Sequence, residues 1–391
     1  MSMPKGPQPF PRNEYLRRLS AVKAEMERRE IDVLVVTTSA NITYLSGYTS
    51  KSGYVPQGLI VSLKNEEPTF FTRRQDAPAA LHQMFIERTR VNGYPEALIA
   101  NPDMDGFDAV IDFLRDNGFA RRQIGLEMNF LTHRSIEKFK TRMSDATIVD
   151  FTNGVTWIRG IKSDLEIAVM REAAAISDAA MLRARDVIRP GVREADAASE
   201  IIATLVRGTN GRAGTDLASF YVCASPRSAT PHIRWSEDVF RNGSQINLEF
   251  GGVRHGYVSP LMRTLTIGKP SERLRRLHEG EVAGMEAALA AIKPGATCSE
   301  VAEAFYSTLR KHGFEKDSRC GYAVGIEWTE PTASLKLGDS TVLRPNMTFH
   351  LMLGNWIDED LGYVISETFR VTETGAETFS RIPRDLFEIY V

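Results

Sequence analysis

The chain has 391 residues with a formal net charge of -2, and 42% of its residues are hydrophobic. This length allows two domains, and this composition supplies a buried core, which excludes an intrinsically disordered protein. A nearly balanced charge exerts no long-range attraction on nucleic acid or anionic lipid, so we expect neither as a partner. A small molecule or a peptide is the expected ligand.

The N-terminal residues and the cysteines indicate the cellular compartment in which we expect the protein. The first ten residues, MSMPKGPQPF, contain no apolar run of signal-peptide length, and no later stretch approaches the apolar length of a membrane span. These features predict a cytoplasmic protein. Cys223, Cys298 and Cys320 have no C-x-x-C spacing, which argues against a disulfide framework and a structural zinc site. We expect buried or incidental thiols.

Residues 1–152 alternate between helical and strand-like patterns. Residues 11–29 carry apolar side chains at helical spacing and lead into a strand-like run, Ile31 to Thr38. Further strands are expected over 58–63 and in the segments IGLEMN and ATIVDFT, with a helix over 106–117. This alternation predicts an α/β domain.

A second domain is expected over residues 153–391. Ser163 can cap a helix that continues to Val187, because Asp164 and Glu166 in its first turn favour the positive end of the helix dipole. A strand is expected at 219–223 and a helix over 274–292. Two similar segments, each a Pro-Gly turn followed by a helix, indicate a duplicated half-domain.

The segment from Ser244 to Leu265 predicts a β-hairpin. An apolar run ends in Gly251-Gly252, a turn signal, and a second run continues through Tyr257 to Leu265. We expect the turn at the glycine pair.

This hairpin resembles that of the creatinase/prolidase (M24, pita-bread) family, which reads roughly D-x-G-x-x-x-x-G-Y-x-S-D-x-T-R-T. Gly256-Tyr257, Ser259 and Arg263-Thr264 match that pattern. The string R-x-I-K-S-x-x-E-I, which begins at Arg159, is similar to the entry into the family's catalytic domain. The resemblance implies an α/β (α+β) protein with an N-terminal creatinase-like domain and a C-terminal pita-bread domain with pseudo-symmetric halves.

The family's metal ligands are Asp, Asp, His, Glu and Glu, and all of these positions differ in this chain. The resemblance places them at Glu249, Pro260, Tyr322, Met352 and Ser366. A transition-metal ion needs several nitrogen, oxygen or sulfur donors in one shell, and a lone carboxylate cannot supply them. We therefore expect no catalytic metal and no other cofactor.

Glu249 and His232 are the expected catalytic residues. Glu249 lies between Leu248 and Phe250 on a strand that enters the core, where an unpaired carboxylate is costly. The alternative is a structural ion pair with Arg263 or another cation. His232 follows Pro231, where the resemblance places a histidine that contacts substrate and transfers protons; the alternative is a histidine with no role in catalysis.

The remaining candidates are substrate contacts. Aromatic faces and carboxylates together suit a cationic or amidine-like ligand, although each tryptophan alone is as well explained by core packing. Glu367 is either such a contact or a structural hydrogen-bonding group. In the resembled family the N-terminal domain lies beside the active site, often that of the partner subunit in a dimer, which makes Tyr48 either a contact or a surface-loop residue. The predicted substrate-binding set is Glu367, Tyr322, Trp328, Trp356, Arg263 and Tyr48.

Within the family, the chain is most similar to a metal-free branch, the ectoine hydrolases, through K-D-S-R-x-G-Y-x-x-G at Lys316 to Gly325 and P-x-M-T-F-H at Pro345 to His350. This resemblance implies a cytoplasmic, homodimeric hydrolase that opens a cyclic amidine such as ectoine or 5-hydroxyectoine. Glu249 would act as nucleophile or as general base. The alternatives are a creatinase-like amidino hydrolase with another small substrate, a non-catalytic binding module, and a metallo-aminopeptidase with unusual ligands.

Overall fold

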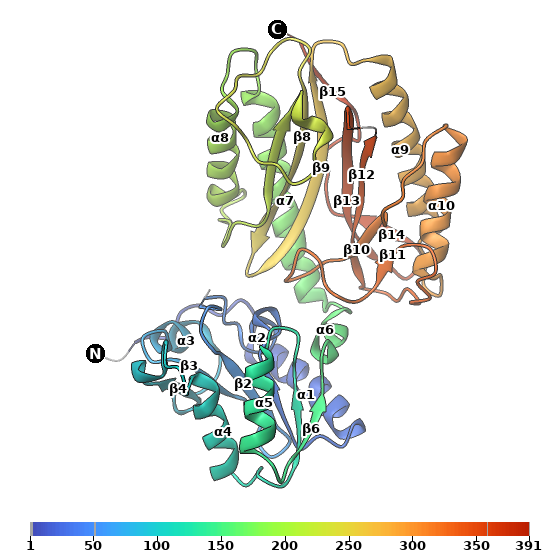
Figure 1. Ribbon diagram of the computed structural model, residues 1–391. Coiled ribbons are helices and arrows are strands. Elements are labelled where there is room, and N and C mark those ends of the chain that lie inside the picture. The colour runs from blue at the N-terminus through green and yellow to red at the C-terminus, as the bar shows by residue number, and fades with distance from the viewer. Residues whose placement is uncertain (1–2, 51, 358, 391) are drawn as a thin grey trace. The chain divides into compact units, whose positions relative to one another are not determined.

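The computed structural model describes residues 3–50, 52–357 and 359–390. The chain forms two compact units, Met1–Arg159 and Gly160–Val391 (Figure 1). The sequence-based boundary at 152/153 precedes the short helix α6 (Gly154–Arg159), which belongs to the first unit.

The first unit is built on a mixed six-stranded sheet with the order β4-β3-β2-β1-β5-β6. The central strand β1 pairs antiparallel with β2 and parallel with β5, and all of its residues are buried because elements cover both faces. The strands are β1 (Val33–Val36), β2 (Gly58–Ser62), β3 (Thr69–Arg73), β4 (Val91–Tyr94), β5 (Gln123–Leu126) and β6 (Thr147–Asp150). The other helices are α1 (Arg12–Arg28), α2 (Ser39–Ser46), α3 (Ala77–Gln83), α4 (Gly106–Asp116) and α5 (His133–Arg142). The α/β domain expected from the periodicity is confirmed.

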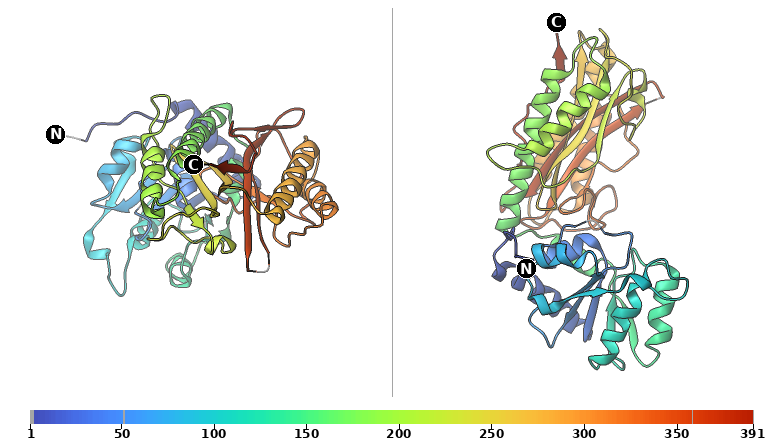
Figure 2. Two further views of the ribbon diagram at one scale, coloured as in Figure 1. Left: turned by 90° about the horizontal axis from the view of Figure 1, so that it is seen from above. Right: turned by 90° about the vertical axis from the view of Figure 1, so that its left-hand side faces the viewer.

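The second unit contains two sheets, with the orders β15-β9-β8-β7 and β11-β10-β12-β13-β14. Helices α7 and α8 pack against the first sheet, and α9 and α10 pack against the second (Figures 1 and 2). The helices are α7 (Asp164–Val187), α8 (Glu194–Arg207), α9 (Glu272–Ala291) and α10 (Cys298–Lys311). The strands of the first sheet are β7 (Phe220–Ala224), β8 (Gln245–Arg254), β9 (Tyr257–Ile267) and β15 (Phe387–Ile389). Those of the second are β10 (Gly321–Ala323), β11 (Ser334–Leu335), β12 (Thr348–Ile357), β13 (Leu361–Val371) and β14 (Ala376–Thr378).

Each half of this unit contains two helices, a short strand and a long hairpin in that order, and the second half adds the short strand β11 before its hairpin, so the predicted duplication has a structural counterpart. The start of α7 shows how the sequence specifies one of these elements. The Ser163 hydroxyl accepts a hydrogen bond from the Glu166 backbone N–H (3.3 Å), and the Glu166 carboxylate accepts one from the Ser163 N–H (2.9 Å). This reciprocal cap satisfies two backbone donors and confirms the predicted start of the helix.

Side-chain hydrogen bonds join the two sheets where β9 meets β13. The Thr264 hydroxyl donates to the Val364 carbonyl and accepts from its N–H, both at 3.0 Å. The Ser366 hydroxyl accepts from the Met262 N–H at 2.8 Å. The two hairpins therefore form one continuous framework, on which residues far apart in sequence are held in register.

The hairpin turn lies later in the chain than the glycine pair predicts. Strand β8 passes through Gly251 and Gly252, and the chain reverses at His255-Gly256, which have φ values of 50° and 86°. The predicted turn at Gly251-Gly252 is therefore wrong. A close approach to α7 explains Gly252, since a Cβ atom there would lie 2.3 Å from the Ala173 carbonyl oxygen.

Two expectations from composition can be compared with the structure. Cys223, Cys298 and Cys320 are free and buried, as expected. Over the described residues, no helix combines the length and apolar character needed to cross a membrane.

Candidate active site

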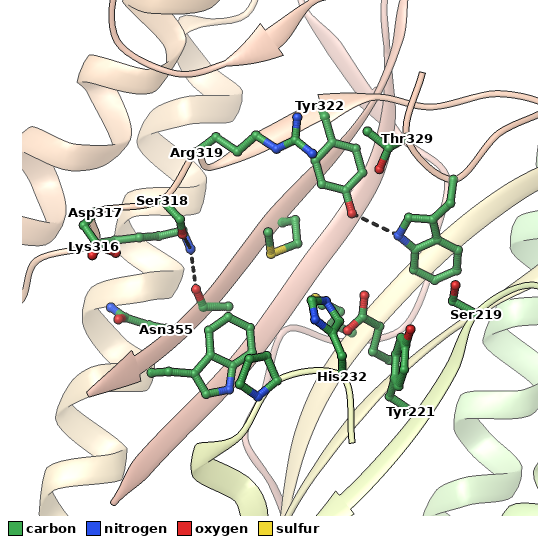
Figure 3. A pocket seen from close by; sticks show the side chains of 17 residues that line it. Ser219, Tyr221, His232, Lys316, Asp317, Ser318, Arg319, Tyr322, Thr329 and Asn355 are labelled. Carbon is green, nitrogen blue, oxygen red and sulfur yellow. Dashed lines mark hydrogen bonds between the residues drawn. The ribbon is translucent and has the colours of Figure 1, made fainter. Parts of the chain in front are cut away.

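A cavity of about 450 Å³ lies within the second unit, a size typical of small-molecule sites. On β12, Met352, Gly354 and Trp356 reach it from alternate positions, as expected for one face of a strand. Strands β7 to β10 and the loops that precede or follow β7 and β10 provide the other walls (Figure 3). The lining residues are Ser219, Tyr221, Pro231, His232, Glu249, Met262, Lys316, Asp317, Ser318, Arg319, Tyr322, Trp328, Thr329, Met352, Gly354, Asn355 and Trp356.

Glu249 contributes a carboxyl group with no hydrogen-bond or ion-pair partner among the described residues. It lies on β8 between Tyr221 of β7 and Met262 of β9, and its side chain is partly buried. Burial raises the pKa of this carboxyl to about 7, and no interaction with a described residue opposes the shift. A carboxyl that titrates near neutral pH can serve as a general base or as a nucleophile.

The expected alternative for Glu249, an ion pair with Arg263, is wrong. Arg263 is fully buried and donates to Glu367 Oε1 at 2.8 Å, and Arg384 donates to the same oxygen at 3.3 Å. Arg263 also donates to the backbone carbonyls of Ser366 on β13 and of Ile382 in the C-terminal segment. This buried pair tethers the C-terminal segment to β9 and β13.

Arg263 and Glu367 do not line the cavity, so the structure gives no support to their predicted contact with substrate. Glu367 is 1% exposed, and burial raises the pKa of its carboxyl despite the neighbouring guanidinium groups of Arg263 and Arg384. The position of Glu367 agrees with the alternative prediction, a structural hydrogen-bonding group.

His232 lies at the cavity wall in the loop between β7 and β8, with a left-handed φ of 61°. Its ring is solvent-exposed and packs beside Tyr221, with 5.4 Å between ring centroids (Figure 3). Tyr221 is also the direct cross-strand neighbour of Glu249. The two predicted catalytic residues therefore flank the same tyrosine, and His232 is open to solvent.

Tyr322, Trp328 and Trp356 supply the aromatic wall that the sequence predicts. The Trp328 indole N–H donates to the Tyr322 hydroxyl at 3.0 Å (Figure 3). Tyr322 is 5% exposed, and burial, followed by the charge of Glu249, raises the pKa of its phenol to about 12. Tyr322 is therefore neutral at physiological pH.

A completely buried histidine supports this wall from behind. His350 Nδ1 lies 3.1 Å from the Tyr322 hydroxyl, and burial lowers the pKa of its imidazole to about 3. Because this histidine is neutral, it adds no positive charge beside the aromatic rings. Its Nε2 has no hydrogen-bond partner in the described chain.

Tyr48 lies inside the first unit. Its side chain is 2% exposed, packs on Phe70 with 4.9 Å between ring centroids, and accepts a hydrogen bond from Gln57 at 3.3 Å. A side chain buried in this way cannot touch a ligand without leaving the core. Neither predicted role, a substrate contact or a surface-loop residue, matches this position.

The positions that bind metal in the resembled family do not form a metal site in this chain. Among the described residues, no group of three or more His, Cys, Asp or Glu side chains could hold an ion. Tyr322 bonds to Trp328, the Ser366 hydroxyl bonds to the β9 backbone, and Pro260 and Met352 carry no oxygen donor. The donors that a divalent metal requires are missing, so we derive no chemical step through a metal.

The sequence-based site missed the polar wall opposite Glu249. Lys316 is 8% exposed, and its ammonium donates to the Ser318 hydroxyl (2.7 Å) and to the Gly354 carbonyl. Asn355 donates to the buried Glu281 at 2.9 Å. Figure 3 shows Lys316, Ser318 and Asn355 across the cavity from His232. The K-D-S-R motif is the sequence signal for this wall, but by itself it indicates only a family resemblance.

Comparisons with known proteins agree with this architecture. Residues 168–373 match Metallopeptidase family M24, and residues 18–161 match the Creatinase/Prolidase N-terminal domain. The chain is 66% identical over 387 residues to the uncharacterized hydrolase/peptidase y4tL of Sinorhizobium fredii, covering 99% of each chain. It is 35% identical over 393 residues to the ectoine hydrolase of Halomonas elongata, covering 97% of this chain and 98% of that one.

Solved structures share the fold. The X-Pro aminopeptidase from Thermotoga maritima has a TM-score of 0.83 at 21% identity, covering 95% of this chain and 99% of that one. The Xaa-Pro dipeptidase from Bacillus anthracis has a TM-score of 0.81 at 25% identity, and the match covers 96% of this chain and 100% of that one. The fold and the matches define a hydrolase of the pita-bread class. The chain belongs to metallopeptidase family M24, which confirms the predicted family and fold class.

Proposed function

We propose that the chain is a metal-independent hydrolase that cleaves a C–N bond in a small cyclic amidine, with ectoine and 5-hydroxyectoine as the first substrates to test. The observation that carries this proposal is the Glu249 carboxyl, which lines an aromatic cavity and has no counter-ion in the part of the chain that the structure describes. The 35% identity to an ectoine hydrolase over nearly the whole chain supports the substrate.

The charge of an amidinium ion complements the cavity. The ring cation would be attracted to the faces of Tyr221, Tyr322, Trp328 and Trp356 and to the Glu249 carboxylate. The bound amidinium would serve as the counter-ion of Glu249. A bound cation would also lower the pKa of the carboxyl and keep it ionised for the reaction.

The reaction adds water across the amidine carbon and breaks one of its bonds to nitrogen. Glu249 either takes a proton from the attacking water or attacks the carbon itself, forming an ester-like adduct that water then resolves. In both routes a new C–O bond forms, one C–N bond breaks, and the departing ring nitrogen gains a proton that His232 can deliver. The products are an amide and a free amine joined in one chain.

The electrophile explains how this chemistry can proceed at a site without metal donors. An amidinium carbon already carries positive charge and accepts a nucleophile directly. A neutral peptide carbonyl needs a Lewis acid or an oxyanion hole to stabilise the developing negative charge. The replaced ligand positions thus favour an amidine over the peptides named for several M24 relatives.

In the proposed assembly the enzyme acts as a homodimer, as the family resemblance implies. Sedimentation of the purified protein at several concentrations tests this state. A monomer at all concentrations would overturn the dimer and leave the chemistry of the cavity untouched.

A proton NMR time course tests the reaction. The protein is treated with chelator and incubated with ectoine, 5-hydroxyectoine or creatine, and the spectra are followed for ring opening or urea release. We expect ectoine to become N-acetyl-diaminobutyrate isomers at a rate that neither chelator nor added Mn²⁺ or Co²⁺ changes. Turnover that disappears with chelator and returns with metal would refute metal independence, and release of urea alone would favour a creatinase-like amidino hydrolase.

A further inference from the structure

The cavity carries a cationic group that the proposed chemistry does not use. Lys316 and Arg319 both line it, and both precede β10 on the same loop. Glu249 is the carboxyl of the opposite wall, and Asp317 is exposed at the rim. Whether this wall can bind an anion therefore depends on whether Lys316 and Arg319 already have partners within the protein.

The charge of Lys316 is compensated within the protein. Its ammonium donates to the Ser318 hydroxyl and the Gly354 carbonyl, and the carboxyl groups of Glu281 and Asp317 act on it. Burial still lowers the pKa of this ammonium. Lys316 adds positive potential to this wall, but most of its hydrogen-bonding capacity is already used.

Arg319 has no such compensation. Its guanidinium lies over the ring of Tyr322, with 4.4 Å between its central carbon and the ring centroid, and Nη1 donates to the Ser334 hydroxyl at 3.1 Å. No carboxylate of the described chain lies within ion-pair distance of it. A guanidinium offers five N–H donors in a planar fork, so donors remain for a ligand.

The stacking on Tyr322 also holds the guanidinium in place. Figure 3 shows Arg319 extending along the Tyr322 ring, on the side of the cavity away from His232. A fixed guanidinium loses little conformational entropy when it binds an anion. The cavity thus has a carboxyl group on one wall and, on the other, a preoriented cation that forms no ion pair with any residue the structure describes.

We propose that Arg319 forms a carboxylate subsite, and that the substrates are zwitterions in which an amidinium and a carboxylate are part of one small molecule. This inference rests on the proposed function for the amidinium half. The substrate carboxylate accepts hydrogen bonds from Arg319, and the amidinium is thereby directed to Glu249. Arg319 is a specificity residue, since it selects against amidines that lack the acid group.

Paired substrates test the subsite. The kcat/KM values for ectoine and for 2-methyl-1,4,5,6-tetrahydropyrimidine, which lacks the carboxylate, are measured for the wild type, Arg319→Gln and Arg319→Lys. The wild type should prefer ectoine by roughly 10- to 100-fold, the range of a charge-assisted hydrogen-bonded pair. Arg319→Gln should remove this preference by slowing ectoine alone, and Arg319→Lys should restore part of it.

A control variant and a second measurement separate the possible failures. Arg310→Gln, on the exposed face of α10, removes an equal charge and should leave the preference unchanged. Binding of propionate, followed by tryptophan fluorescence, tests the subsite without turnover. Arg319→Gln should weaken propionate binding about tenfold or more.

The outcomes distinguish a failure of the proposed reaction from a failure of the carboxylate subsite. If neither amidine is hydrolysed but propionate binds through Arg319, the proposed reaction fails and the carboxylate subsite stands. If ectoine is hydrolysed and Arg319→Gln slows both amidines equally, the reaction stands and the subsite is overturned. A wild type that neither turns over an amidine nor binds propionate overturns both.

Discussion

Replacing Glu249 by glutamine should make the protein more stable and inactive at the same time. Glutamine has the size of the neutral acid but cannot ionise, so the substitution removes only the cost of holding a negative charge in the cavity. A residue whose removal raises stability and abolishes turnover is retained for function and not for folding.

The pKa of Glu249 sets the size of this effect. A rise from the usual 4.5 to about 7, at about 1.4 kcal/mol per pH unit, corresponds to a destabilisation of about 3 kcal/mol by the ionised form. The folded state binds the proton more tightly than the unfolded state does. This carboxyl therefore lowers the free energy of unfolding as pH rises from 4.5 through 7, and its full cost is present above pH 7.

The assay is urea unfolding of the wild type and Glu249→Gln at several pH values, with the difference between the two curves isolating this one group. At pH 8 the variant should be more stable by about 3 kcal/mol, and the difference should fall below about 1 kcal/mol near pH 5. Turnover of ectoine should be lost while binding stays measurable.

Asp178→Asn is the matched control. Burial also raises the pKa of the Asp178 carboxyl, but this residue lies on α7 and bonds to Ser380 and the Arg381 N–H outside the cavity lining. This variant should keep its turnover. A Glu249→Gln variant that is active, or that gains no stability at pH 8, would refute the reasoning.

Three further measurements test other parts of the site. The kcat/KM for ectoine should rise as the pH increases through about 7, because Glu249 acts in its ionised form; a fall over this range would instead assign it the role of an acid. Tyr322→Phe should lower the free energy of unfolding by about 1 to 3 kcal/mol in urea titrations, since the partly buried Trp328 N–H and the fully buried His350 Nδ1 both lose a hydrogen bond; unchanged stability would mean that these bonds contribute nothing. Arg263→Ala should cost about 3 to 5 kcal/mol, because the buried Glu367 carboxylate would lose its shorter ion pair and keep only the longer contact with Arg384; a variant as stable as the wild type would contradict the proposed tether between β9 and the C-terminal segment.

Local patterns specified much of the fold in advance. The cap at Ser163, the helical spacing of α1 and α7 and the apolar strand runs depend on neighbouring residues, so they can be read from the chain. The family framework and the lost metal ligands followed from motifs. The turn at the Gly251-Gly252 pair was predicted wrongly because glycine also allows close packing of a strand on a helix, and only the position of α7 distinguishes the two uses.

The roles of the charged side chains could not be predicted from the sequence. Glu249 and Glu367 are both acids on buried strands, yet Glu249 lines a cavity with no partner among the described residues, whereas Glu367 binds Arg263 across two sheets. Tyr221 and Arg319 join the site only because β7 and the loop before β10 face the same cavity. Burial and ion pairing depend on contacts between distant segments. The sequence therefore supplied the chemical groups, and the packing of the two half-domains determined which of them remain available for a ligand.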